Sequence, residues 1–393
     1  MKASIAVLAG DGIGPEVTAE SRRCLAAIAG LFHHEFEFLD LPFGGAAIDA
    51  HADPLPERTL GACRAANAVL LGAIGGPKWS APDAPLRPEA GLLRLRKELG
   101  VYANLRPVVV HPALVDASTL KADVVRDVDL IFVRELTGGI YFGDKHRDAR
   151  SARDVCVYEV TEIERIVRVA ARLAQARRGR LTSIDKANVL ETSRLWRDVT
   201  QRLVTREFPG VRLEHMLVDA AAMHLIHRPR DFDVLVTENM FGDILTDEAS
   251  MLAGSLGLLP SASLGEGTRG VYEPIHGSAP DIAGRNSANP YGAILSAALL
   301  LRHSLRLETE AAALEQAVAD AISAGALTVD LASANRRALT TSEAGDAVLS
   351  RLPQRAGTPD ATACGPPVRA PVPGPPADPR APRSQPTDES ARR

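Results

Sequence analysis

The sequence predicts an α/β fold, and two observations support that prediction. Short apolar runs of strand length alternate with segments of helical period along most of the 393 residues. That length is also enough for two domains of ordinary size or for one large α/β unit, and no repeat of fixed period is present.

The expected elements follow one another along the chain. An apolar run at residues 4–8 predicts the first strand, and Pro15, which suits the first turn of a helix, precedes helical spacing up to residue 28. Helices are also expected at residues 57–66 and 161–177, and the chain becomes helical from residue 290 onward. Further strands are expected at residues 35–39, 68–71, 128–133, 181–184, 211–217 and 232–236.

Composition excludes several classes of partner. The net charge is −4, from 45 basic and 49 acidic residues, so no overall field attracts nucleic acid or an anionic membrane. No apolar stretch is long enough to span a membrane, and the N-terminus does not resemble a signal peptide. The four cysteines lack C-x-x-C spacing, which fits a reducing cytoplasm.

The end of the chain differs in composition from the rest. Of the 41 residues in 353–393, 11 are proline and none is aromatic, so we expect this tail to be disordered. It is interpreted as a solvated extension, with a proline-rich ligand for a partner domain as the alternative.

A glycine cluster at residues 10–14 follows the first strand and opens a helix, as a dinucleotide fingerprint would. It fails that test, because Pro15 stands where the third glycine is needed and Glu16 would repel a pyrophosphate. The cluster is therefore predicted to be a tight turn, and its contact with a ligand is left open.

One predicted helix face carries an acid, two leucines and a cation. Glu89, Leu92 with Leu93, and Arg96 recur at i, i+3/i+4 and i+7. An arginine on a buried helix face needs an anion to compensate it. The alternative is that Arg96 pairs with Glu89 or with solvent.

Two more arginines, Arg106 and Arg134, occupy strand-like positions. A guanidinium matches carboxylate geometry, so three converging arginines would bind a di- or tricarboxylate. Their spacing does not prove that they converge.

A tyrosine and a lysine follow at the ends of predicted strands, where α/β proteins keep their chemistry. Tyr141 lies beyond a glycine turn, and Lys186 ends the strand at residues 181–184. Nearby cations would favour an ionised phenol and an uncharged lysine, which tunes both toward proton transfer near neutral pH. The alternative is that each is structural.

Three aspartates suggest a cation site. A helix beginning near Gly242 would project Asp243 and Asp247 from one face at i, i+4, where a cation between them relieves their repulsion. Asp219, at the junction of a strand and a helix, could supply a third oxygen ligand. Oxygen ligands alone point to Mg²⁺ or Mn²⁺. The alternative is that Asp243 caps the helix and Asp247 is solvated.

A loop rich in glycine and proline precedes the last helical region, at residues 273–290. Within it Asp281 is a natural acceptor for a ribose 2′-hydroxyl, whereas a 2′-phosphate would call for a cation.

Taken together, these segments closely resemble the isocitrate/isopropylmalate family of β-decarboxylating dehydrogenases, and within it the branch that acts on 3-isopropylmalate. The resemblance runs from residue 4 to about residue 352 and rests on long motifs: GDGIGPEV, NLRP, VRELTGGIYFG, DKANVLE, FGDILTDEASMLAG and EPIHGSAPDIAG. It implies an α/β, two-domain fold with a central mixed sheet that is not a Rossmann fold. A cofactor domain would span 1–101 and 255–352, and a substrate, metal and dimerisation domain would span 102–254.

The resemblance also implies roles for particular residues. Arg96, Arg106 and Arg134 would bind the malate carboxylates, while Tyr141 and Lys186 would form the acid/base pair. Asp219, Asp243 and Asp247 would hold Mg²⁺ or Mn²⁺, with Asp219 also reaching the substrate. Lys186 and Asp219 would come from the partner in a homodimer. NAD would bind at Gly76, Pro77, Lys78, Glu89, His276, Gly277, Ser278, Ala279, Pro280, Asp281, Ile282 and Asn289.

Substrate choice follows from the same comparison. Isocitrate enzymes of the family carry Ser and Asn where this chain has Ala90 and Leu92, so its slot is apolar. Leu92, Leu93 and Val189 would suit an isopropyl group, and an isocitrate carboxylate would be left unpaired there.

The implied activity is the NAD-dependent oxidation and decarboxylation of 3-isopropylmalate to 4-methyl-2-oxopentanoate in leucine biosynthesis. Alternatives are a tartrate, malate or isocitrate dehydrogenase of the family, and a catalytically silent regulatory subunit. Departures from the family pattern at residues 144–158 and 328–337 concern the expected dimer contacts.

Overall fold

The computed structural model describes residues 1–333 and 336–353. The tail predicted to be disordered therefore lies outside the described residues, apart from Pro353.

The strands are β1 (Lys2–Gly10), β2 (Glu35–Asp40), β3 (Ala68–Ala73), β4 (Ala103–Val109), β5 (Asp129–Glu135), β6 (Lys145–Arg147), β7 (Ala152–Asp154), β8 (Arg180–Asp185), β9 (Arg212–Leu217), β10 (Val234–Thr237), β11 (Pro260–Leu264) and β12 (Gly270–Pro274). The α-helices are α1 (Gly14–Leu31), α2 (Gly44–His51), α3 (Glu57–Ala65), α4 (Pro88–Leu99), α5 (Ala122–Val125), α6 (Val160–Ala176), α7 (Glu191–Glu207), α8 (Val218–His227), α9 (Asn239–Ser250), α10 (Tyr291–His303), α11 (Glu308–Ser323) and α12 (Thr341–Leu349).

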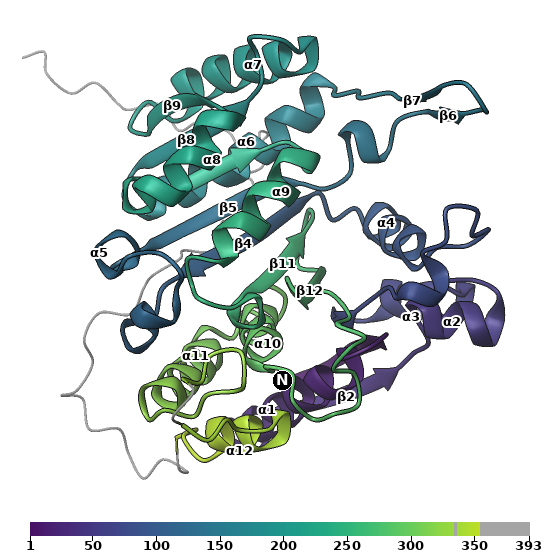
Figure 1. The fold of residues 1–393 in the computed structure, drawn as a ribbon, viewed down its shortest axis with the longest axis vertical. Coiled ribbons are helices and arrows are strands. Elements are labelled where there is room, and N and C mark those ends of the chain that lie inside the picture. Colours follow the sequence, from purple (N-terminus) through teal and green to yellow (C-terminus); the bar gives the residue numbers. More distant parts are fainter. Residues whose placement is uncertain (334–335, 354–393) are drawn as a thin grey trace, which may run out of the picture.

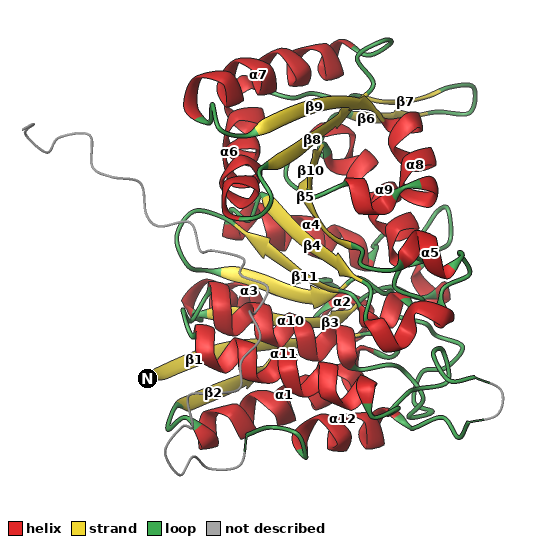
Figure 2. Cartoon of the chain, turned by 90° about the vertical axis from the view of Figure 1, so that its left-hand side faces the viewer, coloured by secondary structure: helices red, strands yellow, loops and turns green. Residues whose placement is uncertain are grey.

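One mixed sheet of ten strands runs through the molecule (Figures 1 and 2), in the order β2-β1-β3-β12-β11-β4-β5-β10-β8-β9. Its two flanks are parallel, and the three pairings in the middle, β12-β11, β11-β4 and β4-β5, are antiparallel. The mixed sheet confirms the predicted fold class. β6 and β7 form a separate exposed hairpin that projects from the body of the molecule.

Helices cover both faces of the first flank, and the strand sequence shows why. Along β1, Ile5 and Val7 face the core cluster that includes the apolar side of α1, whereas Ala6 and Leu8 face a second cluster beneath α3 and α4. A parallel strand covered on both faces has near-continuous apolar sequence, and that run predicted β1.

The sheet order keeps the two predicted units apart. β2, β1, β3, β12 and β11 come from residues 1–101 and 255–352, and the remaining five strands come from 102–254. The two sets meet at the β11-β4 pairing. The exact domain boundaries stay a prediction, because a single sheet is continuous across them.

Most expected elements are present, with two corrections. The helix expected near Gly242 begins at Asn239, because the Glu238 side chain accepts a hydrogen bond from the Phe241 N–H and caps the helix there. The β11-β12 hairpin was not predicted, because its polar residues hide the apolar run of a buried strand. Among the described helices, none is long and apolar enough to cross a membrane.

Candidate active site

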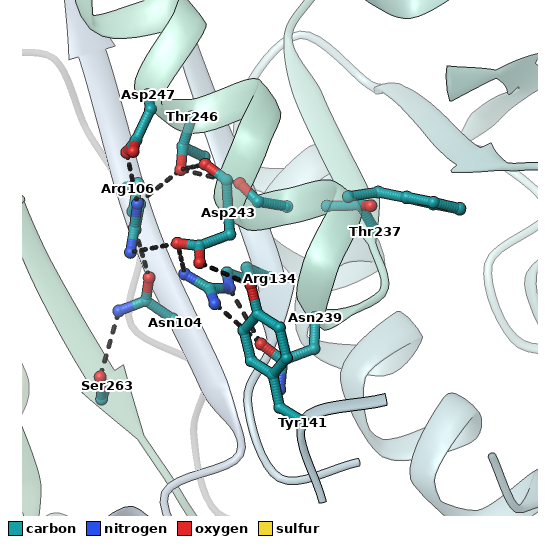
Figure 3. Close-up of polar contacts among 12 residues, drawn as sticks. Asn104, Arg106, Arg134, Tyr141, Thr237, Asn239, Asp243, Thr246, Asp247 and Ser263 are labelled. Carbon is teal, nitrogen blue, oxygen red and sulfur yellow. Dashed lines mark hydrogen bonds and ion pairs between the residues drawn. The ribbon is translucent and has the colours of Figure 1, made fainter. Parts of the chain in front are cut away.

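Two buried arginines meet a helix face at the centre of the sheet (Figure 3). Arg106 projects from β4 and Arg134 from β5, with exposed fractions of 7% and 2%. The antiparallel pairing of these strands sets Asn104 opposite Arg134, so Arg106, two residues further along β4, projects on the same side. Both guanidinium groups lie against α9, which carries Asp243 and Asp247.

The contacts of the two arginines differ. Arg134 forms an ion pair with Asp243 through Nη1, and its Nε and Nη2 donate to Asn239 Oδ1 over 3.2 and 2.8 Å. Arg106 donates from Nε to Asn104 Oδ1 over 2.7 Å and from Nη1 to Thr246 Oγ1 over 2.5 Å.

The carboxylates of Asp243 and Asp247 lie farther from Arg106 than these hydrogen-bond acceptors do. Its Nη2 lies 3.8 Å from Asp243 and its Nη1 lies 3.6 Å from Asp247. The helix thus presents two acids to the arginines from one face, as the i, i+4 spacing predicted.

Burial and mutual repulsion leave positive charge uncompensated here. Desolvation, followed by the charge of Arg134, lowers the pKa of Arg106 to about 9. Desolvation also lowers the pKa of Arg134, against the attraction of Asp243. Desolvation opposes ionisation of Asp243, but Arg134 and Arg106 outweigh it and lower the pKa of that carboxyl. An added anion would relieve this cluster.

Arg96 joins the group from α4. Its exposed fraction is 7%, and its charge is among those that lower the pKa values of Arg106 and Arg134. Arg96 Nη2 contacts Glu273 Oε1 at 2.8 Å, so its partner is neither Glu89 nor solvent. Its Nε is buried and makes no hydrogen bond within the described residues. The three arginines therefore do converge, which their spacing alone left undecided.

Tyr141 ends a short 3₁₀ turn, Gly139–Tyr141, and its hydroxyl donates to Asp243 Oδ2 over 2.9 Å. Burial, and then the nearby charge of Asp243, raises the pKa of Tyr141 to about 12. The expectation of an ionised phenol was therefore wrong. Arg134 does approach the ring, at 5.9 Å from its centroid, but the carboxylate is nearer to the hydroxyl. The protonated phenol is a proton donor.

Lys186 and Asp219 form a separate pair. Lys186 directly follows β8, Asp219 lies in the first turn of α8, and Lys186 Nζ contacts Asp219 Oδ1 at 2.6 Å. The hydrogen bond from Lys186 lowers the pKa of Asp219. The described chain thus sets a carboxylate beside Lys186, and the cations that were expected to keep the lysine neutral are not its contacts.

Only part of the predicted metal set comes together in one chain. Asp243 and Asp247 share a face of α9, whereas Asp219 stays with Lys186. Among residues 1–333 and 336–353, no group of three His, Cys, Asp or Glu side chains is arranged to hold a metal. Glu238, rather than Asp243, caps α9, so the helix-cap alternative for Asp243 was wrong.

Comparison with known proteins decides the family. A sequence model described as isocitrate/isopropylmalate dehydrogenase matches residues 4–348, which is nearly the whole described chain. The chain belongs to this family.

Curated relatives in this family are similar over nearly their full length. A 3-isopropylmalate dehydrogenase of Rhodopirellula baltica is 56% identical over 357 residues, covering 90% of this chain and 99% of the relative. The 3-isopropylmalate dehydrogenase of Bacillus subtilis is 57% identical over 338 residues, covering 84% and 92%.

Solved structures of the family share the fold. An isocitrate dehydrogenase from Methylococcus capsulatus aligns with a TM-score of 0.79 at 32% identity, covering 90% of this chain and all of that chain. A β-decarboxylating dehydrogenase from Thermococcus kodakarensis aligns with a TM-score of 0.72 at 34% identity, covering 89% and 96%.

The glycine turn after β1 organises loops of this family member. The buried Asp11 carboxylate accepts N–H bonds from Gly45, Ala46 and Gly75, each at 2.8 Å. Gly12 has a φ of +58°, and a Cβ there would lie 1.9 Å from the Ser278 carbonyl oxygen, so only glycine fits. The turn, which fails the Rossmann fingerprint, thus fixes the loops that carry the predicted NAD residues.

Those NAD residues fall into two groups in this dehydrogenase fold. Gly76, Pro77 and Lys78 precede α4, which begins at Pro88 and carries Glu89 in its first turn, and Lys78 pairs with Asp49 at 2.6 Å. A Cβ added to Gly75 would lie 3.1 Å from Glu89 Oε1, so these segments are neighbours.

The second group lies on the loop that ends at α10. His276 is buried, desolvation lowers its pKa, and its Nε2 makes no hydrogen bond within the described residues. The Nδ1 atom of the His276 ring lies 2.9 Å from the Gly277 carbonyl oxygen. Asp281 is exposed, and Asn289 Nδ2 donates to Asp330 over 3.0 Å. Ser278, Ala279, Pro280 and Ile282 complete the same loop.

The residues predicted to enclose the alkyl group are only partly gathered. Leu92 and Leu93 are half-buried on α4, next to Arg96 along the helix. Val189 is 62% exposed and follows Lys186 after β8. Val189 therefore lies near Lys186, which the family resemblance assigns, with Asp219, to a partner subunit.

Sequence reasoning missed Asp11, Asn104 and Asn239. Asn104 lies inside a motif quoted for the family and Asn239 lies two residues before another, yet no charge or spacing rule singles out a neutral amide. Asp11 was discarded with its glycine turn when the fingerprint failed.

Proposed function

We propose that this chain is an NAD-dependent 3-isopropylmalate dehydrogenase that oxidises and decarboxylates (2R,3S)-3-isopropylmalate to 4-methyl-2-oxopentanoate and CO₂ in leucine biosynthesis. The observation that supports it most is the buried, incompletely neutralised arginine cluster beside the protonated Tyr141. The alkyl malate, as opposed to another hydroxy acid, is proposed from curated 3-isopropylmalate dehydrogenases that are 53% to 58% identical to this chain.

Each step of the reaction uses a group of this chain. Arg96, Arg106 and Arg134 bind the two carboxylates. The hydrogen-bonded pair of Lys186 and Asp219 accepts the proton of the C2 hydroxyl while a hydride leaves C2 for NAD. The C3–carboxylate bond of the resulting ketone then breaks to release CO₂, and Tyr141 donates its proton to C3 of the enolate.

A divalent cation fits the acidic residues of this site. Asp243 and Asp247 offer hard oxygen ligands from one helix face, as Mg²⁺ and Mn²⁺ prefer. Asp219 of a second copy supplies the third carboxylate. When bound, the cation contributes Lewis acidity to oxidation and decarboxylation.

NAD fits the loops around the glycine turn. Within the part of the chain that the structure describes, Nε2 of the buried His276 has no hydrogen-bond partner, and a ligand can supply one. The exposed Asp281 accepts a ribose 2′-hydroxyl and repels a 2′-phosphate, which favours NAD over NADP.

A homodimer completes the site. Exposed apolar side chains gather on α8 and α9 and directly after α9. Met223 and Ile244 are 62% and 60% exposed, and Ile226 and Met251, which follows α9, are about half exposed. Such a face on two adjacent helices fits a partner copy. The same association brings Lys186, Val189 and Asp219 to the arginine cluster of the other subunit.

Other exposed apolar residues extend this face toward the hairpin. An apolar cavity of about 340 Å³ lies there, lined by Ile140, Cys156, Leu190, Trp196 and Phe241 among others. Val155 and Val157, at the base of the hairpin, are 37% and 53% exposed.

Within the proposed enzyme, residues 1–101 and 255–352 form the cofactor domain, and residues 102–254 form the substrate, metal and dimerisation domain. A role in leucine biosynthesis implies a cytoplasmic location.

The test is an assay of NAD reduction with Mg²⁺ or Mn²⁺ in which 3-isopropylmalate, isocitrate, tartrate and malate are offered in parallel. The expected result is the highest kcat/KM with 3-isopropylmalate, because Leu92 and Leu93 leave a third carboxylate unpaired. Faster turnover of any other acid would overturn the substrate assignment, and absence of turnover would overturn the proposed activity.

A further inference from the structure

Two buried asparagines hold the arginines of the candidate active site from behind. Asn104 and Asn239 have exposed fractions of 0% and 1%. Each presents its carboxamide oxygen to the Nε of one arginine, Asn104 to Arg106 and Asn239 to Arg134 (Figure 3). The orientation of each amide is fixed, because guanidinium nitrogens only donate.

The surroundings of Asn104 explain how it is held. Its Nδ2 donates to Ser263 Oγ over 3.1 Å, and the strand pairings set Ser263, Asn104 and Arg134 side by side across β11, β4 and β5. Arg106 is also held by Thr246 Oγ1, another neutral acceptor. Among the described residues, no carboxylate oxygen lies within 3.5 Å of the Arg106 guanidinium.

Asn239, unlike Asn104, also contacts the loop that carries Tyr141. Its Nδ2 donates to the Gly138 carbonyl over 3.2 Å, directly before the turn that ends in Tyr141. One side chain therefore connects the carboxylate-binding Arg134 to the loop of the proton donor.

Buried arginines elsewhere in the described chain are held differently. Arg177 contacts Asp129 and Asp233, each at 2.8 Å, and Arg302 contacts Glu308 and Glu315, each at 2.9 Å. These carboxylates outweigh desolvation and raise the pKa values of both arginines. Arg106, by contrast, donates to two neutral acceptors, Asn104 Oδ1 and Thr246 Oγ1. Two carboxylates per arginine complete a structural ion pair, and they leave no charge for a ligand.

We infer that Asn104 and Asn239 are positioning residues that orient Arg106 and Arg134 for the carboxylates of the substrate without adding a negative charge to the site, in which Asp243 already pairs with Arg134. The inference rests on the proposed function. An aspartate at either position would hold its arginine equally well, but it would place a first carboxylate in contact with Arg106, or a second one in contact with Arg134, before a dianionic substrate arrives. The neutral amide gives orientation without competition.

Asn104→Asp separates orientation from charge. The substitution is isosteric, the introduced carboxylate still accepts from Arg106, and the Ser263 hydroxyl can rotate to donate to the new oxygen. Arg106 keeps the new carboxyl ionised. We expect KM for 3-isopropylmalate to rise by about tenfold or more, the effect of a unit charge several ångströms away at an effective dielectric constant of about 20. The KM for NAD should change little, and the unfolding midpoint should not fall.

Two further variants supply the controls. Asn104→Ala removes the orientation and adds no charge, so its KM for the substrate should rise less than that of Asn104→Asp. Asn67→Asp adds the same charge at an exposed asparagine whose oxygen accepts from the Ser4 N–H at 2.9 Å, and its KM should equal that of the wild type.

The outcomes distinguish this inference from the proposed function. If the wild type turns over 3-isopropylmalate and Asn104→Asp leaves its KM unchanged, the inference is wrong while the function stands. An equal rise in Asn104→Ala and Asn104→Asp also refutes it, because orientation alone would then explain the effect. A wild type without activity contradicts the proposed function instead.

Asn239→Asp adds a readout that a charge effect alone would not give. An aspartate there cannot donate to the Gly138 carbonyl and sets two oxygens against each other. We expect the KM of this variant to rise as in Asn104→Asp, and its kcat to fall as well because the Tyr141 turn loses its anchor. A fall in kcat in Asn104→Asp as large as in Asn239→Asp would contradict the assigned difference between the two residues.

Discussion

Replacing Asp243 with asparagine should affect both stability and activity, and the two effects can be separated. The Asp243 carboxylate forms an ion pair with Arg134, lies 3.8 Å from Arg106 and accepts the Tyr141 hydroxyl at 2.9 Å. Asparagine keeps one oxygen acceptor but removes the charge that compensates two buried arginines.

The size of the stability loss in Asp243→Asn depends on how far the Asp243 side chain is buried. Removing one partner of a fully buried ion pair costs about 3–5 kcal/mol of unfolding free energy. The Asp243 side chain is 36% exposed, so water screens part of the charge, and the remaining amide retains a hydrogen bond. We therefore expect Asp243→Asn to lower the unfolding free energy at pH 7 by about 1–3 kcal/mol.

The stability contribution of Asp243 should depend on pH, and its pKa shift fixes the direction of that dependence. The pKa of Asp243 is lowered in the folded chain, so its contribution is fully present above the ordinary aspartate pKa and is lost as pH falls through the folded value. Urea unfolding at fixed protein concentration should show the difference between variant and wild type at pH 7. That difference should narrow only when pH falls below about 4.

Asp247→Asn is the matched control on the same helix. Its side chain is 62% exposed, and desolvation raises its pKa, so the fold does not depend on its charge. Both variants should lose metal-dependent activity, but only Asp243→Asn should lose stability. Equal stability of Asp243→Asn and wild type at pH 7 would refute the charge-compensation argument, and retained metal-dependent activity in either variant would refute the metal role.

Two other substitutions test the proton donor and the cofactor loops. Tyr141→Phe should lower kcat by about 10²–10⁴-fold with a small change in KM. A variant with the kcat of the wild type would exclude Tyr141 as the acid. Because the pKa of Tyr141 is raised to about 12, the wild-type rate should show no loss from phenol ionisation at neutral pH. Asp11→Asn leaves one acceptor oxygen for the N–H groups of Gly45, Ala46 and Gly75. It should therefore lower the unfolding free energy by about 1–3 kcal/mol and raise the KM for NAD more than the KM for the hydroxy acid. Equal changes in the two KM values would contradict a role of Asp11 in the NAD loops.

The sequence predicted most of this fold because its strands are apolar on both faces. The strands β1, β3, β5 and β10 contain continuous apolar runs, and their positions were expected. β8 was also expected, from Leu181 and Ile184 on either side of the buried Thr182 and Ser183. The β11-β12 hairpin was missed, because Ser261 and Ser263 are buried yet polar. Burial of such hydroxyls depends on partners contributed by other strands, which a local pattern does not contain.

The candidate site shows the same division. Arg106 and Arg134 could be assigned to strands from their neighbours, but their convergence depends on the antiparallel register of β4 and β5. The protonation state of Tyr141 was predicted wrongly, since the sequence gives the number of nearby arginines and not which charge contacts the hydroxyl. Position relative to neighbouring strands and helices, which the local sequence does not encode, decides both properties.

Separate placement of the two groups of site residues predicts complementation between defective subunits. Arg134, Tyr141 and Asp243 lie together, whereas Lys186 and Asp219 pair with each other. If each active site takes the first group from one copy and the second from its partner, a mixed dimer of Tyr141→Phe and Lys186→Met has one intact site and one doubly defective site. Equal co-expression should then restore about one quarter of the wild-type activity, because about half of the dimers are mixed.

The control pairs two defects of the same group, Tyr141→Phe with Asp243→Asn, for which every dimer lacks an intact site. Recovery in the first mixture and none in the second requires that Lys186 act on substrate held by the other subunit. If neither mixture recovers activity although mixed dimers form, the site lies within one chain, and the exposed apolar face of α8 and α9 then needs another explanation.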